Sequence, residues 1–129
     1  MLTRFKRIHW MSYSPTTRIR SFRFSRFLVD LDLSGNDLLT GALPLDNSLR
    51  DSITILDVSG TDFTNSFNSI LQSLPKVEFL NVGRTFMSGS IPTDIGDLVP
   101  NLQHLHLSWN NGIEGTIPTE IGNLSNLGT

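Results

Sequence analysis

Two histidines, His104 and His106, stand two positions apart in the chain and are the nearest it comes to a metal-binding pair. Alternate residues of an extended strand point to the same side, so both imidazoles would share one face. A zinc site needs a third protein ligand and support around it. The side chain expected beside them is Asn81, a poor metal ligand, so we expect neither a metal nor a cofactor.

Catalytic motifs are missing from the sequence. It contains no G-x-S-x-G, no phosphate loop of the form G-x-x-x-x-G-K and no H-E-x-x-H. Serine, histidine and aspartate can be collected from its polar positions, but any repetitive polar face offers such sets by chance. No nucleic-acid-binding module is recognisable either. We therefore predict that the chain is not an enzyme and does not bind nucleic acid.

Binding chemistry is better represented. Trp109 and Arg84 are of the two residue types most favoured as anchors in binding interfaces. Together with the histidine pair they fall on positions that would share the outward face of a short sheet. We expect a ligand-binding face made of Phe79, Asn81, Arg84, His104, His106 and Trp109. The alternative interpretation is that these are ordinary solvated strand positions.

A repeated phrase must position these residues. The segment 88–98, SGSIPTDIGDL, returns as EGTIPTEIGNL at 114–124. An alternating L-x-L or L-x-V unit occurs four times at intervals of 24 or 25 residues. The units begin at Leu28, Ile53, Val77 and Leu102, and a fifth begins at Leu127, of which the sequence contains three residues. A fixed period of this length predicts a solenoid in which each unit forms one coil.

The alternating residues predict the core. Side chains two apart on a strand point to one face, so successive coils should stack their aliphatic residues in columns. One coil cannot bury its apolar face alone and needs its neighbours. The inward columns are Leu31, Leu56, Leu80 and Leu105, then Leu33, Val58, Val82 and Leu107.

The turns carry three further signals. Asn36 and Asn110 follow a strand, where an amide satisfies backbone groups of the turn, and Thr61 and Thr85 replace that amide with a hydroxyl. We expect weaker order at those two turns. Gly41, Gly89 and Gly115 suggest positions where a side chain would obstruct the bend. Prolines follow them and predict an irregular or 3₁₀ return segment: Pro44, Pro92 and Pro118.

This combination resembles a known family. Residues 77–124 are similar to the plant-type leucine-rich repeat, L-x-x-L-x-L-x-x-N-x-L-x-G-x-I-P-x-x-[LI]-G-x-L, and the resemblance extends over about 28–129. The second unit is the most divergent, with Asn65 for the glycine and Phe67-Asn68 for Ile-Pro. The resemblance implies an α/β solenoid: a right-handed coil with a short parallel β-sheet on its concave face and irregular or 3₁₀ segments on its convex face.

The same resemblance implies a recognition module within a receptor-like or inhibitor-like protein. Its ligand would be a protein or peptide of unknown identity. Further repeats of the parent protein would follow at the C-terminal end, and that parent would be extracellular or at the plasma membrane. Asn123 begins an Asn-Leu-Ser acceptor for glycosylation, which applies if the chain is secreted. No apolar run is long enough to span a membrane.

The first 27 residues do not keep the period. They hold seven basic residues and no acidic one, whereas residues 28–129 hold three basic and all twelve acidic residues. A distorted coil can be placed on Phe5, Ile8, Trp10 and Tyr13, which suggests a poorly ordered or degenerate cap. An organelle transit peptide and an artefact of the gene start stay open. We therefore divide the chain into a basic segment, 1–27, and a solenoid, 28–129.

Two other functions stay open. Some solenoids of this family bind ice, which requires a flat array of small polar side chains. The lateral positions would align as Thr40, Thr64, Ser88 and Glu114, and as Ala42, Ser66, Ser90 and Thr116. The other reading is a truncated fragment of a longer repeat protein with no function of its own.

Overall fold

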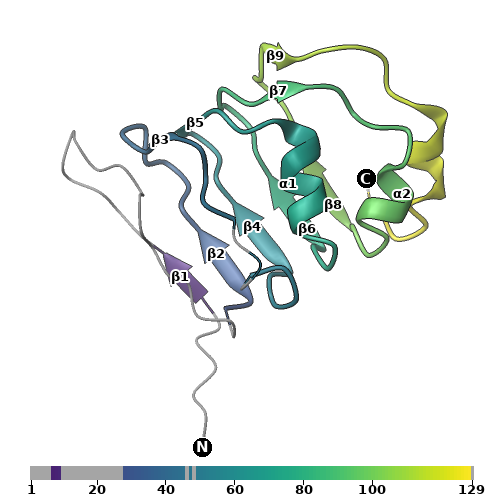
Figure 1. Cartoon of the computed structure of the whole chain (residues 1–129), viewed down its shortest axis with the longest axis horizontal. Coiled ribbons are helices and arrows are strands. Elements are labelled where there is room, and N and C mark those ends of the chain that lie inside the picture. Colours follow the sequence, from purple (N-terminus) through teal and green to yellow (C-terminus); the bar gives the residue numbers. More distant parts are fainter. Residues whose placement is uncertain (1–6, 10–27, 46, 48, 129) are drawn as a thin grey trace, which may run out of the picture.

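A parallel β-sheet runs through the computed structural model, which describes residues 7–9, 28–45, 47 and 49–128. Its five strands follow one another along the molecule in the order β1-β2-β4-β6-β8 (Figure 1). The strand register aligns Leu31 with Leu56, Leu80 and Leu105, as the period predicted. The strands are β1 (Arg7–His9), β2 (Asp30–Asp32), β4 (Ile55–Asp57), β6 (Phe79–Asn81) and β8 (His104–His106).

The two inward columns form the core. Leu31, Leu56 and Leu80 are fully buried, and the second column is equally enclosed at Leu33, Val58 and Val82. Removing each of these side chains from water stabilises the fold by roughly 1.5–3 kcal/mol. Their column-mates on the last described coil, Leu105 and Leu107, are only partly buried because no described strand lies beyond β8.

Strand β1 lies inside the segment that the sequence set apart from the solenoid. It pairs in parallel with β2, with Ile8 opposite Leu31 in the strand register. The assignment of residues 1–27 to a poorly ordered or degenerate cap stays a prediction. The predictions for residues 1–6 and 10–27, Trp10 and Tyr13 among them, concern positions outside the described residues.

Lateral strands add two small sheets that the sequence did not predict. The strands β3 (Thr40–Gly41) and β5 (Asp62–Phe63) pair in parallel, as do β7 (Ser88–Gly89) and β9 (Gly112–Ile113). These strands lie together at one side of the molecule, away from the five-stranded sheet (Figure 1). A bridge between Ser66 and Ser88 joins the second and third coils.

This lateral register contradicts the columns drawn for an ice-binding face. Thr40 stands opposite Asp62 and not Thr64, because the lateral strands are offset by two residues from the repeat alignment. Ser88 likewise stands opposite Gly112 instead of Glu114. The aligned rows of small polar side chains that ice binding requires are therefore not formed.

The convex segments differ from coil to coil. The fourth coil has the predicted 3₁₀ helix, η1 (Thr119–Asn123), which begins directly after Pro118. The third has a four-residue helix, α2 (Ile95–Leu98), and the second a seven-residue helix, α1 (Phe67–Ser73). A proline keeps the residue before it out of the helical region. Since Phe67-Asn68 replaces Ile-Pro, the second coil becomes helical at that point.

The Asn/Thr residues of the turns bond to the backbone as expected, but the glycines are needed for a different reason from the one predicted. Asn36 Nδ2 donates to the Leu33 carbonyl at 2.8 Å, and Thr61 Oγ1 donates to the equivalent Val58 carbonyl at 2.7 Å. The threonine therefore retains the main bond of this column. Gly41, Gly89 and Gly115 have φ of 88°, 106° and 93°, yet an added Cβ at each would meet no close contact. The turn requires their left-handed backbone, and steric obstruction is not the reason.

Asn65 shows how the second coil manages without that glycine. Its side chain bonds both backbone groups of Leu43 in the preceding coil. The Leu43 N–H donates to Asn65 Oδ1 at 2.6 Å, and Asn65 Nδ2 donates to the Leu43 carbonyl at 3.3 Å.

None of the helices in the described part of the chain has the length and apolar character needed to cross a membrane.

Candidate ligand-binding face

The strand register places four of the predicted site residues side by side on β6 and β8. Phe79 pairs with His104, and Asn81 pairs with His106. The rings of Phe79 and His104 lie 5.7 Å apart between centroids, tilted by 49°. Both histidines are exposed. Within the described ranges, no three histidine, aspartate or glutamate side chains lie close enough together to hold a metal ion.

Asn81 uses both ends of its side-chain amide in hydrogen bonds within the chain. Asn81 Nδ2 donates to Asp57 Oδ2 at 3.1 Å, and the Gly83 N–H donates to Asn81 Oδ1 at 3.1 Å. In the preceding coil, Asp57 Oδ1 accepts both the backbone N–H and the hydroxyl of Ser59, at 3.0 and 2.6 Å. Asn81 thus links two coils and sets the turn that carries Arg84.

Arg84 and Trp109 share an unusual backbone conformation. They are the two non-glycine residues with positive φ in the described part of the chain, at 56° and 63°. The same turn position holds Gly35 and Gly60 in the first two coils, at 71° and 66°. A left-handed conformation costs a residue with a Cβ roughly 1–2 kcal/mol. The two side chains are therefore kept at this position against a local backbone penalty.

Two hollows meet at Arg84, along the edge where the strands end. One, of about 590 Å³, is lined by Ser34, Gly35, Asp37, Ser59, Gly60, Asp62 and Arg84. The other, of about 410 Å³, is lined by Asp62, Arg84, Thr85, Phe86, Trp109, Asn111 and Gly112. Because Asp62 and Arg84 line both, we treat the two as one feature and name it the turn-edge trough.

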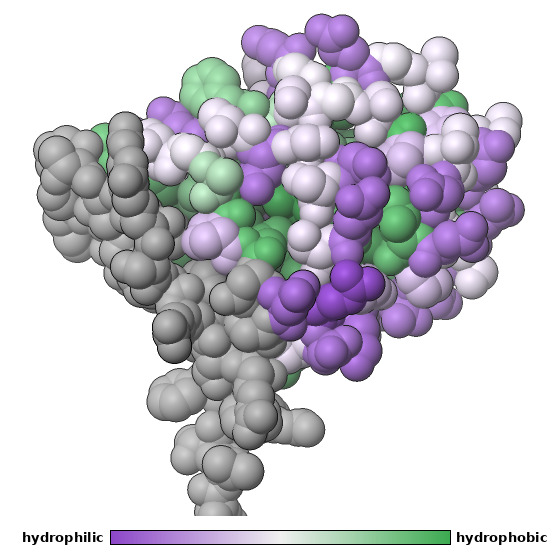
Figure 2. Space-filling model, viewed as in Figure 1, coloured by the Kyte–Doolittle hydropathy of each residue, from purple (hydrophilic) through white to green (hydrophobic). Residues whose placement is uncertain are grey.

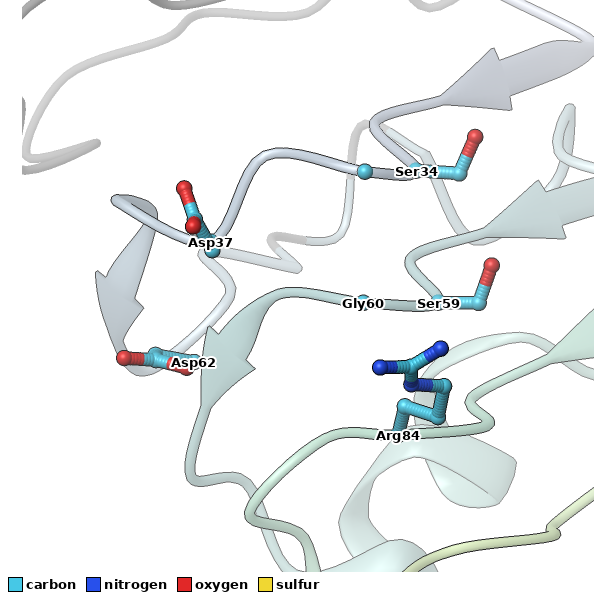
Figure 3. A pocket seen from close by; sticks show the side chains of 7 residues that line it. Ser34, Asp37, Ser59, Gly60, Asp62 and Arg84 are labelled. Carbon is cyan, nitrogen blue, oxygen red and sulfur yellow. The ribbon is translucent and has the colours of Figure 1, made fainter.

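The walls of the turn-edge trough differ in chemistry. In Figure 3, Asp37 and Asp62 lie on one side, the Ser34 and Ser59 hydroxyls on the other, and the Arg84 guanidinium reaches toward Ser59 and Gly60. The far end is aromatic, because Trp109 is 81% exposed and Phe86 is 64% exposed. Phe86 is thus a large apolar side chain left in water beside a polar hollow.

Asp37, Asp62 and Phe86 also line the trough and were not predicted as site residues. A signal for them existed, since each directly follows a residue of the Asn/Thr turn column, as Asn111 does. A third hollow of about 300 Å³ lies on the strands themselves and is lined by Asp30, Asp32, Ile55, Asp57 and Phe79. The outward face is therefore acidic over the first two coils, both on the strands and in the turns.

Asn123, the predicted glycosylation acceptor, lies in the convex segment of the fourth coil and does not line the turn-edge trough. It is the last residue of η1, and its side chain is exposed. It lines a shallow hollow with Thr93, Asp94, Gly96 and Asp97. A glycan there would not meet the turn-edge trough.

On the face seen in Figure 2, hydrophilic side chains surround separate hydrophobic patches.

The backbone at Trp109 gives a stability prediction. We expect Trp109→Gly to be more stable than Trp109→Ala by about 1 kcal/mol, because glycine adopts positive φ without a Cβ penalty. Urea unfolding of both variants of the full chain measures the difference. The control is the same pair at Phe86, whose φ is not positive. There glycine should be the less stable variant, and the same sign at both positions would contradict the strain at Trp109.

Comparisons with known proteins agree with this fold. Two family models described as Leucine Rich Repeat match residues 101–124 and 24–42. Receptor-like protein 39 of Arabidopsis thaliana is 36% identical over 119 residues, which cover 89% of this chain and 13% of that protein. The second match begins inside the basic segment, at residue 24.

Solved structures give the same picture. The plant peptide hormone receptor RGFR1 in complex with RGF2 is 26% identical, with a TM-score of 0.68, over 98% of this chain and 18% of that chain. The Arabidopsis receptor kinase HAESA, in complex with the peptide hormone IDA and the co-receptor SERK1, is 33% identical, with a TM-score of 0.67, over 79% of this chain and 17% of that chain. The chain thus spans less than a fifth of the length of each of these relatives.

Proposed function

We propose that this chain, a leucine-rich repeat protein of the plant type, recognises a peptide on the concave face of its sheet. The ligand would lie over β6 and β8 and enter the turn-edge trough. Phe79, His104 and His106 would contact it from the strands, and Arg84 and Trp109 from the turns. Asn81 would hold the turn of Arg84 in place, as its two hydrogen bonds indicate.

The observation that carries this proposal is the backbone of Arg84 and Trp109. Non-glycine residues in unfavourable conformations persist where the surrounding structure holds them, and they cluster at functional sites. Both side chains are exposed, so the fold itself gains little from them. Tryptophan and arginine also supply most of the energy at many interfaces. The peptide complexes of RGFR1 and HAESA support the same ligand class for this chain.

The test is a selection from a random library of short linear peptides on the immobilised full chain. We expect the selected peptides to lose about tenfold or more in affinity on Trp109→Ala and on Arg84→Ala, which corresponds to hot-spot residues. Isothermal titration calorimetry measures each dissociation constant. Thr119→Ala, an exposed change on η1, is the control and should leave affinity unchanged. Peptides that bind equally well to all variants would overturn the proposal.

A further inference from the structure

We infer that the glycine-floored half of the turn-edge trough binds a lysine or arginine side chain of the ligand. This half is the hollow of about 590 Å³ over Gly35 and Gly60. The inference rests on the proposed function and goes beyond it, because it assigns a chemical identity to one ligand residue and a place in the site to two glycines.

The hollow exists because two coils lack a side chain at the turn position. The equivalent residues in the next two coils are Arg84 and Trp109, so the same left-handed turn accepts large side chains. An added Cβ would meet nothing within 4 Å at Gly35, and only ordinary contacts of 3.6 Å with Gly35 at Gly60. Packing therefore does not exclude a side chain at either glycine. What a side chain there would remove is the open space of the trough.

The acidic wall gives the ligand residue its charge. Asp37 and Asp62 line this hollow from the first two coils, on the side opposite the serine hydroxyls (Figure 3). Carboxylates form charge-assisted hydrogen bonds with guanidinium and ammonium groups, which are about twice as strong as neutral ones. The Ser34–Gly35 and Ser59–Gly60 backbone, bare of larger side chains, leaves room for the aliphatic stem of lysine or arginine.

Arg84 sets the direction of the ligand. Its guanidinium stands at the junction between the glycine-floored half and the aromatic half. A ligand cation is repelled by Arg84 and attracted by Asp37 and Asp62, so it should lie over the first two coils. The ligand's apolar residues would then lie at Trp109 and Phe86. The trough therefore distinguishes a peptide that is basic at one end from its reversed sequence.

The experiment uses the peptides selected on the full chain. We expect lysine or arginine to be enriched at one end of them, and the citrulline analogue of an arginine peptide to bind about tenfold or more weakly. Gly60→Asn should have a similar effect, because asparagine tolerates positive φ and its amide would lie over Gly35. Asp37→Asn should weaken the arginine peptide but leave the citrulline peptide unchanged.

The matched control is Gly41→Asn. Gly41 also has positive φ and open space around its missing Cβ, but it lies on β3, outside the trough lining. It should leave affinity unchanged, and urea unfolding of both variants checks that each folds. If the peptides depend on Trp109 and Arg84 but lack a basic residue or tolerate Gly60→Asn, this inference fails and the proposed function stands. If they do not depend on Trp109 and Arg84, the proposed function fails.

Discussion

Leu80→Ala should lower the free energy of unfolding by about 2–5 kcal/mol, the usual range for a fully buried leucine. Leu80 is fully buried in the inward column, between Leu56 and Leu105. Truncation removes its contacts and leaves a cavity that two flanking coils must close. The whole domain is held by only about 5–15 kcal/mol, so this is a large fraction of its stability. Urea unfolding followed by circular dichroism measures the loss.

Leu105→Ala is the matched control for that prediction. Leu105 belongs to the same column but is only partly buried, because β8 is the last strand of the described sheet. The stability of a repeat protein is approximately a sum over neighbouring coil interfaces. Leu80 takes part in two such interfaces and Leu105 in one among the described strands. We expect the change at Leu105 to be about half as destabilising, and equal effects would contradict the stacked-column account.

The core was predictable because only one stacking of the coils buries the apolar face of every L-x-L unit. An L-x-L unit has only one apolar face, and stacking at a fixed period brings Leu56 directly beside Leu80. The neighbours on the outward face follow from the same register, which explains why Phe79 and His104 were expected together and lie together. Predictions of this kind depend on strand pairing alone, which the repeat determines.

The lateral strands were not predictable in this way. Strands β3 and β5 are two residues long, and no apolar alternation marks them. Both lateral pairs are offset by two residues from the repeat alignment, and nothing in the sequence marks that offset. The trough was missed for a related reason. Its shape depends on the left-handed turns, and an arginine or tryptophan at such a turn gives no sign of that conformation in the sequence.

The helix α1 shows the same limit in another form. The sequence shows that the second coil lacks Ile-Pro. This indicates only that the restraint of proline on the backbone is absent, and it does not predict which conformation replaces it. Without proline, Phe67 and Ile70 both turn into the core from one helical segment, and both are fully buried. The gain in burial decides the conformation, and burial depends on the neighbouring coils.

Asn110 is where one side chain joins two coils most extensively, and we expect Asn110→Ala to lose about 2–4 kcal/mol of stability. Its Nδ2 donates to the Val82 carbonyl at 2.7 Å and to the Leu107 carbonyl at 3.0 Å. Its Oδ1 accepts the Thr85 N–H at 3.1 Å and the Thr85 hydroxyl at 2.7 Å. Alanine leaves these backbone groups without that partner, and a buried unsatisfied group costs about 1–3 kcal/mol.

Asn110→Thr separates the bonds within one coil from those between coils. Thr61 shows what threonine does in this column: its hydroxyl donates to the carbonyl three residues earlier. Threonine at 110 should therefore recover the bond to Leu107 but not those to Val82 and Thr85. Its loss of stability should be about half that of alanine. Urea unfolding orders the three proteins, and a threonine variant as unstable as the alanine variant would show that the inter-coil bonds contribute the whole effect.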